Sequence, residues 1–248
     1  MNKRMFWLAL LPALCASASA GTFDFVVETT TANQKFAFQT DNAANFSIDW
    51  GDGQTVGGLS GSAERSHFYA SPGVYTNKVA GTATRIAFGG GTTTPLLLKD
   101  IVSRLSDGVT GITSAAYMFR GAANIANFTQ ADWFDSASGN VTTMGTMFDS
   151  ATAFKQDISR WNVSKVASFD WFLNGTSLPT EYYDLLLMRW SRRALRPNVS
   201  FHGGSSKYSL GLPEERRQYI KDTFTWTTTD GGTTGLWYTG DPTVVTVR

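Results

Sequence analysis

The first part of the chain alternates apolar and polar residues with the period of β-strands. Short runs of this kind lie at 23–27, 36–38, 46–50, 67–69 and 74–79. Such alternation predicts strands with one buried face. Turns rich in glycine and proline, at 51–53 and 71–73, separate the later runs and favour reversal of the chain. The spacing of strands and turns therefore predicts a small antiparallel β-sandwich over residues 21–90.

Beyond the glycine- and proline-containing segment 89–95, the apolar positions change to a helix-like spacing. Three similar segments carry apolar residues at i, i+3, i+6 and i+7. They are residues 112–122, 141–151 and 166–176. This spacing predicts a short amphipathic helical turn in each copy, with strand-like pieces between the copies at 131–134 and 158–163. A repeat of this length is typical of a solenoid, whose units bury their apolar faces only by stacking, so we expect one over residues 105–178.

The last part of the chain has the pattern of a cap for these repeats. Apolar residues at helical spacing predict a helix from Thr180 that ends before Pro197, because the residue before a proline is disfavoured in a helix. We further expect a strand at 199–201, a helix at 213–224 and a strand at 225–227. A solenoid exposes apolar surface at its ends and needs such a cap. Residues 179–248 are therefore assigned to a C-terminal α/β cap.

Three short motifs in the N-terminal region add a family resemblance. They are W-G-D-G at 50–53, H-x-Y at 67–69 and G-x-Y at 73–75. Their order and spacing resemble a polycystic-kidney-disease (PKD) type domain. That resemblance implies an immunoglobulin-like sandwich over residues 21–90.

A second resemblance comes from the best-preserved copy of the repeat, MFDSATAFKQDISRWNVSKV at 147–166. It is similar to the repeat of BspA-like leucine-rich-repeat surface proteins, and the family's terminal segment is matched at 183–190, 198–208 and 226–232. The chain departs from the family in having few repeats, of which the first is irregular. The resemblance implies a secreted or surface-displayed bacterial protein, for which adhesion and protein binding are the usual proposals.

The expected fold class combines these observations. We expect a mainly β protein with short helices. It begins with a PKD/immunoglobulin-like β-sandwich, continues as a short leucine-rich-type α/β solenoid and ends in a C-terminal α/β cap.

Residues 1–20 have the pattern of a cleaved secretory signal peptide. Basic residues at 3–4 precede an apolar run at 5–14, and Ala-Ser-Ala follows at 18–20. The run is too short to span a bilayer, and no later run reaches the roughly eighteen apolar residues of a membrane-spanning helix. We therefore expect an exported protein, extracellular or at the cell surface, with the periplasm as an alternative. We expect no transmembrane segment in the mature chain.

Charge and cysteine content narrow the classes of function. The chain has 21 basic and 20 acidic residues, and removal of Lys3 and Arg4 with the signal peptide leaves a net charge near −1. A nearly neutral chain gives no electrostatic reason to bind nucleic acid. The only cysteine, Cys15, lies in the signal peptide, so the mature chain is expected to have no disulfide.

Signals of catalysis are nearly absent from the sequence. It contains two histidines, His67 and His202, and none of the short motifs of nucleophilic, phosphate-binding or dinucleotide-binding enzymes. Asp49 and Asp52 suggest a calcium site, but aspartates beside a turn commonly accept backbone N–H bonds, and we favour the turn. We predict a protein that is not an enzyme and that uses no cofactor or metal ion.

The expected function is non-enzymatic binding or adhesion, with a protein or glycan partner at a cell surface or in a matrix. In a solenoid, polar residues between the core positions form the surface that faces a partner, and Arg160 and Lys165 are the candidate partner-binding residues. Two alternatives stay open. One is a structural envelope or spacer subunit. The other is a carbohydrate-binding or glycan-active protein whose Trp133, Trp161 and Trp171 stack on sugars, although their recurrence within the repeat favours packing in the core or at its rim.

Overall fold

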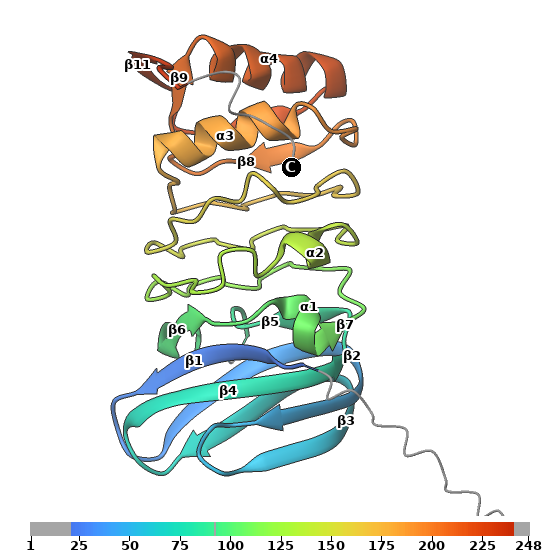
Figure 1. Ribbon diagram of the computed structural model, residues 1–248, viewed down its shortest axis with the longest axis vertical. Helices are drawn as coiled ribbons and strands as arrows, with labels where there is room; N and C mark the ends of the chain where they lie inside the picture. The colour runs from blue at the N-terminus through green and yellow to red at the C-terminus, as the bar shows by residue number, and fades with distance from the viewer. Residues whose placement is uncertain (1–20, 92, 241–248) are drawn as a thin grey trace, which may run out of the picture.

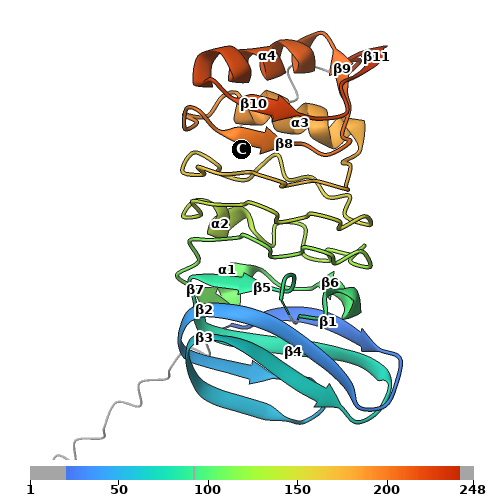
Figure 2. The same ribbon diagram turned by 180° about the vertical axis from the view of Figure 1, so that it is seen from behind.

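The computed structural model describes residues 21–91 and 93–240. The predicted signal peptide, residues 1–20, lies outside the described residues, as do residues 241–248 of the predicted cap. The described chain is elongated, with a β-sheet at one end, stacked turns in the middle and two helices at the other end (Figures 1 and 2). It is mainly β with a few short helices, as expected. None of the helices in the described part of the chain is both long and apolar enough to cross a membrane.

Seven strands form the N-terminal sheet. They are β1 (Phe23–Thr29), β2 (Gln34–Asp49), β3 (Thr55–Tyr69), β4 (Gly73–Thr82), β5 (Arg85–Ala87), β6 (Leu98–Ile101) and β7 (Val109–Thr110). The hydrogen-bonded order is β3-β2-β4-β1-β6, with β5 on β2 and β7 on β4. The run predicted at 36–38 and all but Trp50 of the run predicted at 46–50 lie on one long strand, β2. Asn42 and Asn45 have φ angles of 48° and 49° within it, so the strand bulges there instead of ending.

The sheet contains strands that precede the glycine-rich segment 89–91 in the sequence and strands that follow it. β6 pairs with β1 and β7 pairs with β4, although both follow that segment in the sequence. Gly89 packs directly on the first repeat copy, where an added Cβ atom would lie 2.2 Å from the carbonyl oxygen of Arg120. Only glycine fits such a close approach. The segment is therefore a packed junction between the sheet and the turns.

The two aspartates around Trp50 organise the turn between β2 and β3. Each carboxylate accepts a hydrogen bond from the backbone N–H two residues further on, at 2.9 Å for Asp49 and 3.0 Å for Asp52. Asp52 Oδ2 also lies 2.7 Å from His67 Nε2, and the His67 ring stacks on Trp50 with 5.1 Å between the centroids. These contacts give both aspartates a role in the turn, in line with the interpretation favoured from the sequence.

The Asp52–His67 pair is expected to make the stability of the fold depend on pH in the acid range. Partial burial raises the pKa of Asp52, but the hydrogen bonds from His67 and Gln54 and the nearby imidazole outweigh burial, so the pKa lies below the ordinary 3.8. A lowered folded-state pKa stabilises the fold above the unfolded pKa, and this stabilisation is lost as the pH falls through the lowered value. We expect Asp52→Asn to flatten the fall in Tm between about pH 5 and pH 2, as measured by thermal unfolding.

The control for this prediction is Asp222→Asn, which changes a carboxylate on an exposed helix surface. The fall in Tm with pH should be as steep in that variant as in the unmodified chain. An equally steep fall in Asp52→Asn would show that the pair does not contribute.

The three repeat copies stack as successive turns of the chain (Figure 1). Backbone N–H groups of one copy donate to carbonyl groups of the next. Phe119 N–H bonds the Met147 carbonyl at 2.8 Å, and Phe148 N–H bonds the Phe172 carbonyl at 2.9 Å. Each copy is therefore held by its neighbours, because its backbone groups have their partners there.

The short helical turn predicted in each copy is wrong. Residues 115–122 form consecutive turns closed by bonds to the carbonyl three residues back, such as Met118 N–H to the Ala115 carbonyl at 3.2 Å. Tyr117 has a φ angle of 63°, which an α-helix does not allow. The N–H groups that would have extended a helix instead donate to the next copy.

The strands predicted at 131–134 and 158–163 are also wrong. The first segment is a turn, and the second is a turn with irregular flanks. Ser159 N–H bonds the carboxylate of Asp157 at 2.9 Å, and local bonds of this kind compete with pairing into a strand. The short helices of the middle region are η1 (Pro95–Leu97), α1 (Leu105–Gly108) and α2 (Asp135–Ser138).

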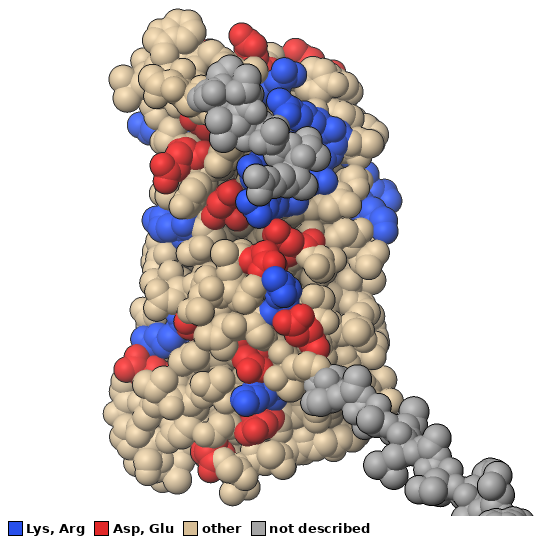
Figure 3. Space-filling view, viewed as in Figure 1, with Lys and Arg blue, Asp and Glu red and all other residues tan. Residues whose placement is uncertain are grey.

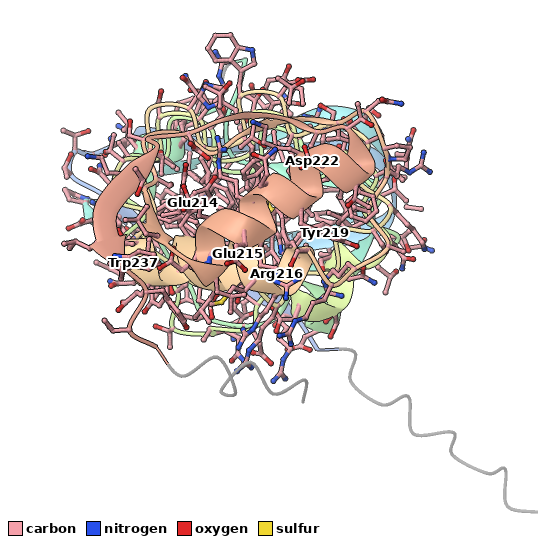
Figure 4. All side chains as sticks on the ribbon, turned by 90° about the horizontal axis from the view of Figure 1, so that it is seen from above. Glu214, Glu215, Arg216, Tyr219, Asp222 and Trp237 are labelled. Atoms are coloured by element: carbon pink, nitrogen blue, oxygen red, sulfur yellow. The ribbon has the colours of Figure 1, made fainter. Side chains whose placement is uncertain are left out.

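The cap contains two helices and two short pairs of parallel strands. They are α3 (Thr180–Trp190), α4 (Leu212–Phe224), β8 (Ser200–His202) with β10 (Thr227–Thr229), and β9 (Tyr208–Leu210) with β11 (Thr233–Trp237). Both predicted helices are confirmed, and the two predicted strands appear one to two residues later than expected. Leu173 N–H bonds the His202 carbonyl at 3.0 Å, so the cap continues the stack, and α4 crosses its outer end (Figure 4).

A continuous line of buried aromatic rings joins the sheet, the turns and the cap. This aromatic spine consists of Phe25, Phe88, Phe119, Phe148, Phe172 and Phe201. Successive ring centroids lie between 4.9 and 6.1 Å apart. Rings at such distances attract one another, and their burial removes a large apolar area from water. The spine explains why aromatic residues recur at fixed positions of the repeat.

Candidate functional site

One of the solvent-accessible positions of the repeat carries a large aromatic residue in two of the three copies. We call this set the outer column; it consists of Tyr117, Thr146 and Trp171. Their φ angles are 63°, 60° and 58°, in the left-handed region that residues other than glycine rarely adopt. Tyr117 is 40% exposed and Trp171 is 58% exposed. The geometry of the turns therefore presents two large aromatic rings to solvent.

Backbone and ring contacts hold the outer column in place. Tyr117 and Thr146 each donate their backbone N–H to the following copy, at 3.2 and 2.7 Å. The Trp171 ring stacks on His202 of the cap, with 5.8 Å between the centroids and 11° between the planes. The column is therefore built into the rigid part of the stack.

A groove of about 270 Å³ lies beside Tyr117, where the sheet meets the first repeat copy. We call it the Tyr117 groove; its lining residues are Gln39, Arg85, the glycines at 89–91, Tyr117 and Arg120. The guanidinium carbons of both arginines lie 5.9 Å from the centre of the Tyr117 ring, within range of cation–π attraction. Its walls come from β2, β5 and the first copy, so only the folded chain assembles the groove.

The two arginines of the groove are held to different degrees. Arg85 makes two hydrogen bonds to Asp41, at 2.7 and 3.2 Å, and is 21% exposed. Arg120 makes one bond to Asp149, at 3.3 Å, and is 48% exposed. Asp149 also accepts a bond from Asn174 at 2.7 Å. Each guanidinium thus has a carboxylate beside it, and that of Arg120 is the less constrained.

Arg160 and Lys165, the residues predicted to bind a partner, are exposed but do not line the Tyr117 groove. Lys165 Nζ donates to Asn140 Oδ1 at 3.1 Å. The Arg160 carbonyl accepts a bond from Arg193 at 2.8 Å, and burial together with the nearby Arg189 lowers the pKa of Arg193. Figure 3 shows Lys and Arg side chains concentrated at the level of the cap, above a region of mixed charge.

The three tryptophans considered as a sugar platform have different environments. Trp133 and Trp161 are buried, and their rings pack edge to face with 5.8 Å between the centroids. Trp171 is the exposed member of the three. The first two pack in the core, as the repeat pattern favours. Trp171 lies at the rim, stacked on His202, and alone among the three is accessible to a ligand.

Sequence reasoning missed the Tyr117 groove. One signal was present, because Tyr117, Thr146 and Trp171 align when the repeat copies are superposed. No pattern in the sequence placed Arg85 next to them, since β5 reaches this position only by pairing with β2.

The histidines have structural contacts in this fold. His67 bonds Asp52, and His202 stacks on Trp171 and accepts the Gly204 N–H at 3.3 Å. Within residues 21–91 and 93–240, no group of three or more His, Cys, Asp or Glu side chains is placed to hold a metal ion.

Comparison with known proteins gives a match for the stacked turns. Residues 105–184 match a family described as "Mycoplasma protein of unknown function, DUF285". The matched segment includes the three repeat copies and the start of α3, and it is less than half of the chain. No curated protein and no solved structure matches the chain. The turns are therefore similar to those of a family whose description assigns no function.

Proposed function

We propose that this protein is an exported, non-enzymatic binding protein of the adhesin type, acting at or near a bacterial cell surface. In this proposal the N-terminal sheet is a PKD-like sandwich and the stacked turns are a short leucine-rich-type solenoid with a C-terminal cap. The similarity of residues 105–184 to DUF285, a family found in BspA-like surface proteins, supports it. The partner is a protein or a glycan of a cell surface or matrix.

The observation that carries the proposal is the outer column with its adjoining groove. Aromatic and arginine side chains are enriched at the centres of binding interfaces. Tyr117 and Trp171 occupy equivalent positions of stacked copies, so their rings lie on one side of the stack. The hydrogen-bonded backbone beneath them is ordered before a partner arrives, which lowers the entropic cost of binding.

Removal of the two rings tests this surface. We expect the double variant Tyr117→Asn, Trp171→Asn to bind its partner at least about tenfold more weakly, because aromatic anchors at interfaces contribute about 2 kcal/mol or more. Asparagine is chosen because it tolerates positive φ angles. Binding is measured by a glycan array and by pull-down of matrix proteins with the mature chain.

The matched control is Tyr219→Asn. Tyr219 lies on the outer face of α4 and is 43% exposed, close to the exposure of Tyr117 (Figure 4). It should leave binding unchanged. Full binding by the double ring variant, with loss in Arg160→Ala, Lys165→Ala, would move the recognition surface to the basic region. Failure of the unmodified chain to bind any glycan, matrix or envelope component would favour a structural spacer.

A further inference from the structure

We propose that the Tyr117 groove binds one carboxylate-bearing sugar residue, a uronic acid or a sialic acid, within a larger glycan. This inference rests on the proposed function and names a ligand class for part of the same surface. It follows from four features of the groove: a partly exposed aromatic residue, a weakly held arginine, fixed donors around the ring, and a volume suited to one sugar.

The Tyr117 ring supplies the apolar face of the site. Sugars present a face of C–H groups that packs on an aromatic ring, while their hydroxyl groups take hydrogen bonds from the surrounding side chains. Both guanidinium carbons lie over the ring, 5.9 Å from its centre. Tyr117 is nevertheless 40% exposed, so part of its side chain is open to a ligand.

Arg120 can exchange its carboxylate partner for one on a ligand. Its bond to Asp149 is long, at 3.3 Å, and the side chain is 48% exposed. Asp149 keeps two other donors when Arg120 leaves, namely Asn174 Nδ2 at 2.7 Å and Ser150 Oγ at 3.2 Å. Both of these donors bond Oδ1, so the exchange frees only Oδ2 of Asp149, the oxygen that Arg120 bonds. A guanidinium group matches a carboxylate with two parallel N–H bonds.

The other walls stay fixed while Arg120 moves. Arg85 is clamped by its two bonds to Asp41, and Gly89 N–H bonds the Tyr117 carbonyl at 3.2 Å. The close approach of Gly89 to the Arg120 backbone leaves no room for a side chain on the floor of the groove. The side-chain amide of Gln39 offers both donors and an acceptor for sugar hydroxyl groups. The groove is thus largely formed before the ligand binds.

The volume favours a sugar over a peptide. At about 270 Å³, the groove is slightly below the range of pockets that hold drug-sized ligands, roughly 300–1,000 Å³. One sugar ring fits this size, whereas an acidic peptide needs an extended surface along which successive residues bind. The nearly balanced charge of the groove also favours a single carboxylate over a polyanion, because Asp41 and Asp149 stay beside it.

The test is isothermal titration of the mature chain with matched sugars. Methyl glucuronide and methyl glucoside differ by one carboxylate, and a methyl sialoside is the second acidic probe. We expect one or both acidic sugars to bind about tenfold or more tightly than the glucoside, as a charge-assisted hydrogen bond allows. Which acid binds more tightly identifies the source of the carboxylate. Equal affinity for acid and neutral sugars would overturn the proposal.

Variants assign the effect to the groove. Arg120→Gln should remove the preference for the acid and keep the weaker glucoside binding. Arg104→Gln is the control, since Arg104 is equally exposed, at 45%, and is likewise paired with one aspartate, Asp132. Tyr117→Asn should weaken the binding of both the acidic and the neutral sugar. Tyr117→Phe keeps the ring and should bind both about as tightly as the unmodified chain. An unchanged acid preference in Arg120→Gln, or stronger competition by a glutamate-rich peptide than by glucuronide, would also overturn the proposal.

The two proposals fail in distinguishable ways. If the chain binds a partner that depends on Trp171 but neither acidic sugar, the groove proposal is wrong and the binding function stands. If the chain binds methyl glucuronide in the groove but no cell-surface or matrix component, the adhesin proposal is wrong.

Discussion

Replacement of Phe148 by alanine is expected to lower the free energy of unfolding by about 3 to 5 kcal/mol. Phe148 lies at the middle of the aromatic spine, stacked on Phe154 with 3.8 Å between the centroids and on Phe119 with 5.4 Å. The neighbouring copies are bonded through their backbones, including Phe148 N–H to the Phe172 carbonyl at 2.9 Å. The surrounding rings therefore cannot close the cavity, and the cavity adds to the lost burial.

Chemical denaturation of the mature chain measures this loss. The matched control is Phe68→Ala, because Phe68 lies on β3 with its ring exposed. Surface substitutions of this kind change stability by no more than about 0.5 kcal/mol. A loss in Phe148→Ala no larger than that in Phe68→Ala would contradict a continuous packed spine.

Replacement of Asp230 by alanine should destabilise the cap to a similar extent, by about 3 to 5 kcal/mol. The buried carboxylate accepts bonds from Arg217 Nε at 2.7 Å, from the Tyr183 hydroxyl at 2.8 Å and from the Gly232 N–H at 3.1 Å. When Asp230 is removed, the largely buried Arg217 cation loses the carboxylate that balances its charge. An uncompensated buried charge is far more costly than a missing surface ion pair.

Tyr183 depends on the same carboxylate. Burial, followed by the negative charge of Asp230, raises the pKa of Tyr183 well above its ordinary 10. Its hydroxyl therefore stays neutral at physiological pH and donates a hydrogen bond to Asp230. Without Asp230 this buried donor loses its acceptor, which adds to the cost.

Two further variants test the origin of the effect. Asp222→Ala removes an exposed carboxylate of α4 (Figure 4) that bonds Gln218 at 2.8 Å, and it should cost about 0.5 kcal/mol or less. Adding Arg217→Met to Asp230→Ala removes the unpaired cation and should restore more than about 1 kcal/mol. If the double variant were no more stable than Asp230→Ala, the buried charge would not be the cause. Thermal and denaturant unfolding give both values.

The N-terminal strands and the cap helices could be predicted because their signals are local. Phe23, Phe25 and Val27 alternate with polar neighbours, and these residues form β1 as expected. Tyr183, Leu186 and Trp190 lie at helical spacing and are buried on one side of α3. In both cases, the period of the apolar residues equals the period of the backbone conformation.

The repeat copies were recognised from the sequence, but their local conformation was not. Apolar residues at Ala115, Met118 and Phe119 suit one face of a helix, yet the copy forms turns. The deciding contacts are hydrogen bonds to another copy, such as Phe119 N–H to the Met147 carbonyl. Periodicity within one copy cannot distinguish a helix from a stacked turn, since both bury the same residues.

The sequence by itself therefore determined the apolar periods of the strands and cap helices, where the repeat copies lie and where the cap begins. Only the tertiary structure separated Trp171, which stays at the surface, from the buried Trp133 and Trp161. It also alone assembled the Tyr117 groove, by bringing Arg85 of the sheet beside Arg120 of the first copy. The physical reason is that the spacing at which side chains return to the same face is set by the local backbone conformation. Exposure and proximity depend on contacts between residues far apart in the chain.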